Sequence, residues 1–168
     1  KVKSLIDYVT GVEVGLDSNA RKNRTGHLME DIVEDFIRET NYTEYHKEMN
    51  KKAINESYSV NIDELINETA KEFIASKRFD FVVKTNRKLY LIETNFYSSQ
   101  GSKLNETARS FKSLGKDIDR LNEIEFIWIT DGIGWLGAKS NLKETFEVIN
   151  HLYTLTNLEH GVLKTVIQ

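Results

Sequence analysis

The chain has 168 residues, of which 39% are hydrophobic and 29% charged, a composition typical of a single globular domain with its own core. Cysteine is absent, which excludes disulfides, thiolate catalysis and cysteine-ligated zinc. The formal net charge is −3 and the pI is near 5.9, so the chain lacks the basic excess that marks many nucleic-acid binders. It also has no apolar run near the ~18 residues of a membrane span.

The first predicted element is a helix over residues 25–40, TGHLMEDIVEDFIRET. Thr25 is its predicted N-cap, so the acids that follow would lie in the first turns, where the helix dipole favours them. Glu30 is expected at the edge of the apolar stripe. The stripe itself consists of apolar residues at helical spacing: Leu28, Ile32, Val33, Phe36 and Ile37.

The middle of the chain contains a predicted β-hairpin. The segment SYSVNI (57–62) is expected to be a strand and 63–75 a helix. The runs FDFVVK (79–84) and LYLIETNFY (89–97) are rich in aromatic and β-branched residues, which favours strands joined by the turn KTNRK. The second run is apolar on both faces as far as Glu93, as expected for a central strand.

A second amphipathic helix is predicted over about 104–121, with Leu104, Ala108, Phe111, Ile118 and Leu121 on one face. EFIWIT (125–130) is predicted to be a buried strand that ends at DGIGW, where Asp131 is expected to be a turn residue. Two more helices are predicted, over 140–152 and 157–166. This order of elements indicates an α/β protein, a mixed sheet flanked by helices.

Two acidic side chains lie at one end of the predicted hairpin. Asp80 opens the first strand, and Glu93 closes the second, with Asn95 two residues further on the same face. Converging carboxylates repel each other unless a cation lies between them, and oxygen ligands of this kind favour Mg²⁺. The spacing is similar to that of PD-(D/E)xK nucleases, with Phe79 in place of the proline and Asn95 in place of the lysine. Spacing alone favours the alternative, that these acids merely cap strand ends.

Longer strings carry a closer resemblance: LIDYVTGVEVGLDSNARKNRTGHLMEDIVEDFI, KRFDFVV, LYLIETNFYSSQGSKLNETARS and FIWITDGIGW. Together they resemble the DpnII/MboI family of type II restriction endonucleases, least clearly across residues 40–75. The resemblance implies a restriction-endonuclease-like fold and Mg²⁺-dependent cleavage of double-stranded DNA at GATC, leaving 5′-phosphates. It also implies a homodimer in the bacterial or archaeal cytoplasm, with no membrane and no small-molecule cofactor. Residues 1–168 are expected to form one catalytic domain, the C-terminal part of a longer protein.

The resemblance also implies roles for individual residues. Asp80 and Glu93 match the metal-binding carboxylates, and Glu30 resembles an extra acid supplied by a neighbouring helix. Asn95 can orient the attacking water but cannot take its proton, so the general base stays open: metal-bound hydroxide or a substrate phosphate are the candidates. Lys103 is the candidate for the missing positive charge. A solvated acid and a solvated loop lysine are the alternatives for Glu30 and Lys103.

Several polar residues are candidate DNA contacts. Basic side chains would meet phosphates, and Ser and Gln side chains would read base edges; the alternatives are solvated charge and a loop without contacts. The candidates are Arg21, Lys22, Arg24, Ser99, Gln100, Lys103, Arg109 and Lys112. Two other functions remain open: a DNA-binding module of the same fold without catalysis, and a repair nuclease specific for DNA structure.

Overall fold

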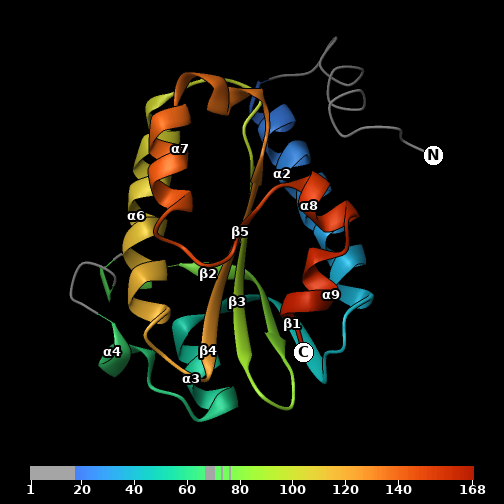
Figure 1. Cartoon of the computed structure of the whole chain (residues 1–168), viewed down its shortest axis with the longest axis vertical. Helices are drawn as coiled ribbons and strands as arrows, with labels where there is room; N and C mark the ends of the chain where they lie inside the picture. The colour runs from blue at the N-terminus through green and yellow to red at the C-terminus, as the bar shows by residue number, and fades with distance from the viewer. Residues whose placement is uncertain (1–17, 67–70, 73, 76) are drawn as a thin grey trace.

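The computed structural model describes the backbone of residues 18–66, 71–72, 74–75 and 77–168, and their side chains except those of 18–26 and 65. A mixed β-sheet lies between two layers of helices (Figure 1). The elements are α2 (Ser18–Arg38), β1 (Glu44–Asn50), α3 (Lys51–Tyr58), α4 (Ile62–Leu65), β2 (Arg78–Lys84), β3 (Leu89–Phe96), α6 (Ser102–Ile118), β4 (Ile124–Asp131), the 3₁₀ helix η1 (Ile133–Gly137), α7 (Lys139–Phe146), β5 (Leu152–Tyr153), α8 (Leu155–Glu159) and α9 (Val162–Val166).

The five strands lie in chain order, β1-β2-β3-β4-β5. β1, β2 and β3 form an antiparallel meander, and the crossover through α6 makes β4 parallel to β3. The short β5 extends the sheet parallel to β4. The predicted hairpin, the central strand and the buried strand EFIWIT are therefore confirmed, and so is the predicted fold class, a mixed sheet flanked by helices.

Each face of the sheet has its own apolar core. On one face, Phe111 and Leu114 of α6 pack over Trp128 and Leu91. On the other face, residues of α2, α8 and α9 pack over the sheet: Met29, Val33, Ile37, Leu158 and Leu163. Glu93 shares strand parity with Leu91, so the sheet places its side chain on the α6 face.

The first helix differs from the prediction at its start. α2 begins at Ser18, so Thr25 is an interior residue and not the N-cap. Glu30 consequently lies in the middle of the helix, away from the favourable end of the dipole. Met29, missing from the predicted stripe, is fully buried with Val33 and Ile37, whereas Leu28, Ile32 and Phe36 are only partly buried.

The predicted strand at 57–62 is wrong. Asn50 caps a helix there, its side-chain oxygen accepting a hydrogen bond from the Ala53 N–H at 2.9 Å. α3 then runs to Tyr58 and ends at Ser59, whose φ of 53° terminates the helix. The strand that the sequence analysis missed is β1. It lies at the exposed edge of the sheet, and its mostly polar residues show no alternation of apolar and polar positions. Within the predicted helix 63–75, the structure shows α4 and helical backbone at 71, 72 and 74, whereas 67–70 and 73 lie outside the described residues.

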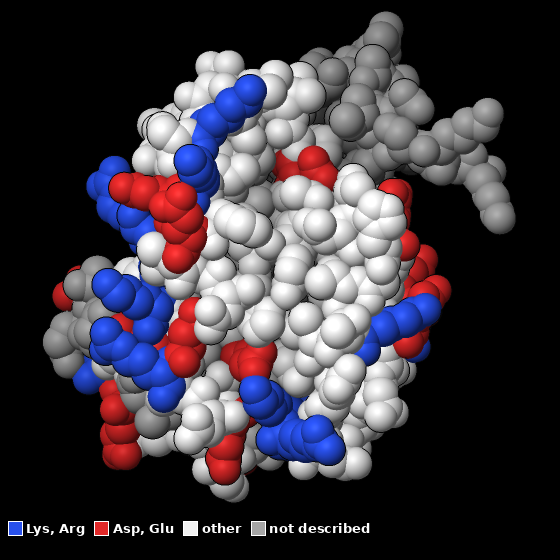
Figure 2. Space-filling model, in the orientation of Figure 1, with Lys and Arg blue, Asp and Glu red and all other residues white. Residues whose placement is uncertain are grey.

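The C-terminal helices are shorter than predicted. α7 ends at Phe146, and residues 152 and 153 form a strand. The predicted helix 157–166 is two helices, because Gly161 adopts φ 80° between them. Among the described residues, no helix combines the length and apolarity needed to cross a membrane. Figure 2 shows Lys and Arg interspersed with Asp and Glu along the side formed by α6 and α7, so the described residues form no broad basic surface there.

Candidate active site

The predicted pair of carboxylates lies where the hairpin strands separate. The β2–β3 ladder is regular from the turn as far as Phe81, which pairs with Ile92. One residue before Phe81, Asp80 accepts hydrogen bonds from the Thr94 backbone N–H (2.7 Å) and from Thr94 Oγ1 (2.9 Å). Both bonds reach the same oxygen, Oδ2. The hairpin thereby fixes the Asp80 carboxylate beside Glu93, as the spacing predicted.

Glu93 is a buried and incompletely satisfied acid. Its side chain is 2% exposed; Oε2 lies 2.8 Å from the Lys77 Nζ, and Oε1 has no hydrogen-bond partner among the described residues. Burial and, after it, the charge of Asp80 raise the pKa of Glu93 to about 8, although Lys77 opposes the rise. A buried carboxylate with a free oxygen is costly unless a cation satisfies it.

Asp80 and Glu30 share this electrostatic environment. Burial raises the pKa of Asp80, although the two bonds from Thr94 oppose the rise. Burial also raises the pKa of Glu30 on α2, followed in importance by the charge of Asp80. Glu30 is thus half-buried, and the negative charge of Asp80 acts on its pKa. The His27 Nδ1 lies 3.9 Å from the Glu30 Oε2.

A hard divalent cation fits the pair formed by Asp80 and Glu93. The unsatisfied Glu93 Oε1 and the mutual repulsion of the two carboxylates both call for positive charge. Among the described residues, no group of three or more His, Asp or Glu gathers as a ligand cluster. Water and phosphate oxygens would therefore complete the coordination, which is how Mg²⁺ is usually held in proteins.

Asn95 is bound to the core and not to the acids. Its Oδ1 accepts a hydrogen bond from the indole N–H of the fully buried Trp128 at 2.9 Å. An indole nitrogen only donates, so this contact identifies the amide oxygen and leaves Nδ2 as the group that faces elsewhere. The Asn95 Nδ2 can therefore donate to a bound oxygen, but the neutral amide is too weak a base to take a proton from water.

The predicted DNA contacts are placed unevenly. Lys103 and Arg109 are exposed on α6, and in the described part of the chain Lys103 makes no ion pair with Asp80 or Glu93. Lys112 instead pairs with the Glu144 carboxylate at 2.9 Å. The backbone of Arg21, Lys22 and Arg24 belongs to α2, but their side chains lie outside the described residues.

The loop carrying Ser99 and Gln100 is held against the end of β4. The Tyr97 N–H donates to the Asp131 carbonyl (2.9 Å), and the Gly134 N–H donates to the Tyr97 carbonyl (2.8 Å). Gly134 permits close packing, because a Cβ there would lie 2.5 Å from the Ser99 carbonyl oxygen. Ser99 and Gln100 are exposed on this supported loop.

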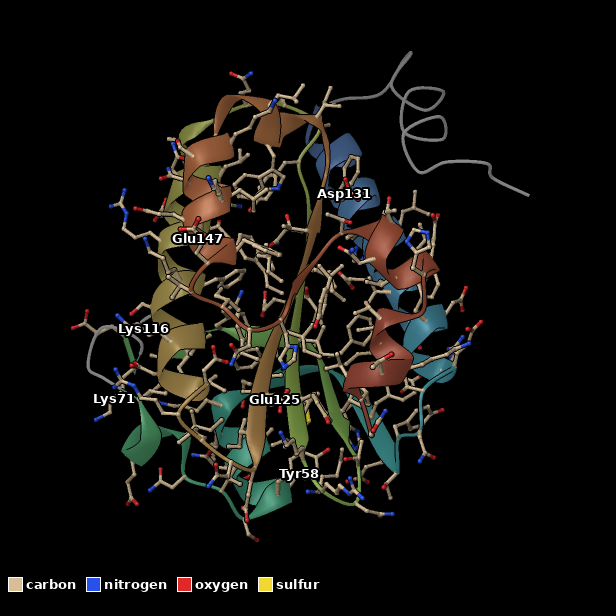
Figure 3. All side chains as sticks on the ribbon, viewed as in Figure 1. Tyr58, Lys71, Lys116, Glu125, Asp131 and Glu147 are labelled. Carbon is tan, nitrogen blue, oxygen red and sulfur yellow. The ribbon has the colours of Figure 1, made fainter. Side chains whose placement is uncertain are left out.

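Asp131, predicted to be a turn residue, is the last residue of β4 and holds the turn that follows it. It lies at the upper end of β4 in Figure 3, far from Glu125 at the lower end. Its carboxylate accepts hydrogen bonds from the backbone N–H of Gly132 (2.7 Å) and Leu155 (3.1 Å), which fixes the turn and the start of α8.

Sequence reasoning missed two residues of the site. Thr94 lies between Glu93 and Asn95 in the motif, and its two bonds to Asp80 depend on the strands separating there. Lys77 lies outside the motif, three residues before Asp80, and only the tertiary structure brings it to Glu93. A lysine next to the start of an acid-bearing strand was the signal available, and it is a weak one.

The fold and the paired carboxylates together define an α/β protein of the restriction-endonuclease-like class. The family described as DpnII restriction endonuclease matches residues 1–165. The chain belongs to this family, and the resemblance seen in the sequence is confirmed.

Named relatives agree with this assignment. The type II restriction enzyme DpnII of Streptococcus pneumoniae is 48% identical over 168 residues, 98% of this chain and 57% of the relative. The type II restriction enzymes MjaIII of Methanocaldococcus jannaschii and MboI of Moraxella bovis are each 42% identical, over 99% and 97% of this chain and 57% and 53% of their own lengths. The chain thus spans about half the length of these relatives. No solved structure matches it.

Proposed function

We propose that the chain is the catalytic domain of a type II restriction endonuclease that hydrolyses double-stranded DNA at GATC with the help of Mg²⁺. Family membership supports the class of reaction, and GATC follows from the resemblance to DpnII and MboI. The observation that carries the proposal is the buried acidic pair, in which Glu93 Oε1 has no partner among the described residues and Asp80 is fixed beside it.

Each residue of the site has a proposed role in the reaction. Asp80 and Glu93 would hold the metal, and Thr94 orients Asp80 through two hydrogen bonds. When bound, Mg²⁺ polarises the phosphodiester and presents a water as the nucleophile. In the reaction, the water oxygen forms a bond to phosphorus while the bond from phosphorus to O3′ breaks. The water loses a proton to solvent and the departing O3′ gains one, which leaves a 5′-phosphate and a 3′-hydroxyl. Glu30 would add negative charge from α2, and the Asn95 Nδ2 would donate to a bound oxygen.

DNA and a second copy of the chain are the proposed partners. A palindromic site is matched by a protein with two-fold symmetry, so we propose a homodimer. The supported loop with Ser99 and Gln100 is the proposed reader of base edges, and the exposed Arg109 the proposed phosphate contact. Restriction acts on DNA entering a cell, so the proposed compartment is the cytoplasm.

A cleavage assay tests the function. Unmethylated duplexes that differ only in carrying GATC or GTAC are incubated with Mg²⁺ and the chain, its Glu93→Ala variant or its Glu123→Ala variant. Glu123 is an exposed acid just before β4 and serves as the matched control. We expect cuts at GATC alone, with the chain and with Glu123→Ala but not with Glu93→Ala. DNA bound but uncut by the unaltered chain would instead indicate a binding module without catalysis.

A further inference from the structure

We propose that Lys77 is a catalytic residue of this site, supplying the positive charge that other nucleases of this fold place where Asn95 stands here. This inference rests on the proposed function and assigns it one more residue. It starts from the salt bridge between the Lys77 Nζ and the Glu93 Oε2, at 2.8 Å.

The Lys77 side chain is held from two sides. Its Nζ contacts Glu93 and also lies 5.1 Å from the centre of the Phe111 ring. Phe111 is itself buried and packs edge-to-face on Trp128, with ring centres 5.0 Å apart. Lys77 is only 24% exposed, so its ammonium group has a defined position and is not a solvated surface charge.

The other candidates for this charge are less well placed. The Asn95 amide is neutral, and its oxygen is occupied by the Trp128 indole. Lys103 is exposed in the first turn of α6 and, within the described residues, makes no ion pair with Asp80 or Glu93. Lys77 is therefore the cation that the structure brings into contact with the acidic pair.

The position of Lys77 suits stabilisation of charge during the reaction. Glu93 presents one oxygen to Lys77, and its other oxygen has no partner within the part of the chain that the structure describes. A cation bound by Glu93 would share that carboxylate with Lys77, so the scissile phosphate would lie close to the ammonium. Negative charge grows on the phosphate oxygens as the water attacks, and a fixed donor in a partly buried site stabilises it. Lys77 transfers no proton in this role.

A purely supporting role makes a different prediction. If Lys77 only held Glu93 ready for the metal, its loss would weaken Mg²⁺ binding, and excess Mg²⁺ would restore the cleavage rate. If Lys77 acts on the phosphate, the rate at saturating Mg²⁺ stays low, because no added metal replaces the donor. The dependence of the maximal rate on Mg²⁺ therefore separates the two roles.

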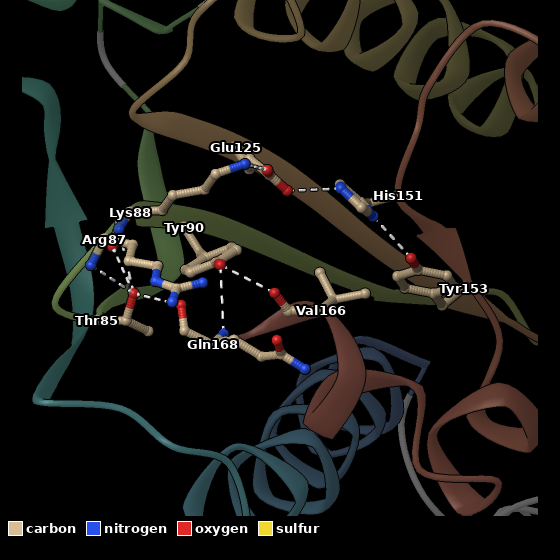
Figure 4. Close-up of polar contacts among 9 residues, drawn as sticks. All are labelled: Thr85, Arg87, Lys88, Tyr90, Glu125, His151, Tyr153, Val166 and Gln168. Atoms are coloured by element: carbon tan, nitrogen blue, oxygen red, sulfur yellow. Dashed lines mark hydrogen bonds and ion pairs between the residues drawn. The ribbon is translucent and has the colours of Figure 1, made fainter.

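The experiment compares Lys77→Met, which removes the charge, with Lys77→Arg, which keeps it. Lys88→Met is the matched control: Lys88 also forms an ion pair with a half-buried carboxylate, Glu125, at the hairpin turn away from the site (Figure 4). Mg²⁺ saturation is measured without activity, as the rise in the midpoint of thermal unfolding. Single-turnover cleavage of the GATC duplex is then measured at saturating Mg²⁺.

We expect Lys77→Met to be stabilised by Mg²⁺ and yet to cleave ~100-fold more slowly at saturation, the effect typical of losing one transition-state donor. Lys77→Arg should recover most of the rate, and Lys88→Met should match the unaltered chain. A loss below ~10-fold at saturation, or a Lys77→Met variant that Mg²⁺ never stabilises, would overturn the catalytic role. If the unaltered chain is stabilised by Mg²⁺ but cuts nothing, the proposed function itself fails, and this role for Lys77 fails with it.

Discussion

Replacing Glu93 by glutamine should stabilise the metal-free protein while destroying its function. Glu93 is buried, and its Oε1 lacks a partner among the described residues. The charge of Asp80 further disfavours the ionised form of Glu93. Glutamine has the same shape, resembles the protonated acid, and keeps an oxygen that can accept from Lys77. The substitution therefore removes an incompletely compensated buried charge without opening a cavity.

The size of the effect follows from the pKa of Glu93, which burial raises from the usual 4.5 to about 8. The folded state binds this proton more tightly than the unfolded state, so the stability gained from protonation is full below pH 4.5 and is lost as the pH rises through 8. At about 1.4 kcal/mol for each tenfold change in proton affinity, the loss is at most about 5 kcal/mol. We expect Glu93→Gln to raise the free energy of unfolding by about 2 kcal/mol or more at pH 9, and far less at pH 5.

Urea unfolding in EDTA, at pH 5 and pH 9, measures this difference. Glu125→Gln is the control, because the two oxygens of Glu125 contact Lys88 and His151, so its substitution should cost stability. Addition of Mg²⁺ should stabilise the unaltered chain and leave Glu93→Gln unchanged. A Glu93→Gln variant less stable than the unaltered chain at pH 9, or equally shifted at both pH values, would refute the reasoning that Glu93 is an uncompensated buried charge.

Three further predictions concern the support of the site. Thr94→Val removes the 2.9 Å hydrogen bond to Asp80 at nearly constant volume. Losing about 1 kcal/mol of support for the Asp80 carboxylate should raise the Mg²⁺ concentration for half-maximal cleavage roughly fivefold. An unchanged Mg²⁺ titration would contradict this prediction. Gly134→Ala should lower the free energy of unfolding, measured by urea titration, by about 1–3 kcal/mol, because the added Cβ would lie 2.5 Å from the Ser99 carbonyl oxygen. Gly101→Ala is the control and should be nearly neutral, because its Cβ would have no atom within 4 Å. EDTA should abolish cleavage but preserve the circular dichroism spectrum, since both apolar cores form without metal, and a loss of helical signal would show otherwise.

Local pattern was sufficient for the central elements. β2, β3 and β4 are rich in apolar, aromatic and β-branched residues, and α6 has a clear apolar stripe, so each element is specified by residues close in sequence. The acids Asp80 and Glu93 could be paired from the hairpin alone, because a tight turn fixes the register of its strands. The family resemblance then supplied the class of protein and the chemistry expected of these residues.

Elements whose stability comes from distant contacts were missed or misplaced. β1 is an exposed edge strand with polar residues, and it exists because β2 offers it hydrogen-bonding partners. The predicted strand at 57–62 gave way to a helix capped by Asn50, and Gly161 divided the predicted last helix. In these last two cases a local cap or backbone conformation, and not a distant contact, decided what the hydrophobic pattern left open.

The sequence by itself determined the fold class, the central strands and the pair of acids, because strand patterns and hairpin register depend on neighbouring residues. Only the tertiary structure decided what surrounds that pair. The separation of β2 from β3 turns the Thr94 N–H toward Asp80, and packing on α6 directs Lys77 to Glu93. These contacts join residues from different elements, and the burial that raises the pKa of Glu93 exists only once α6 has packed over that face of the sheet.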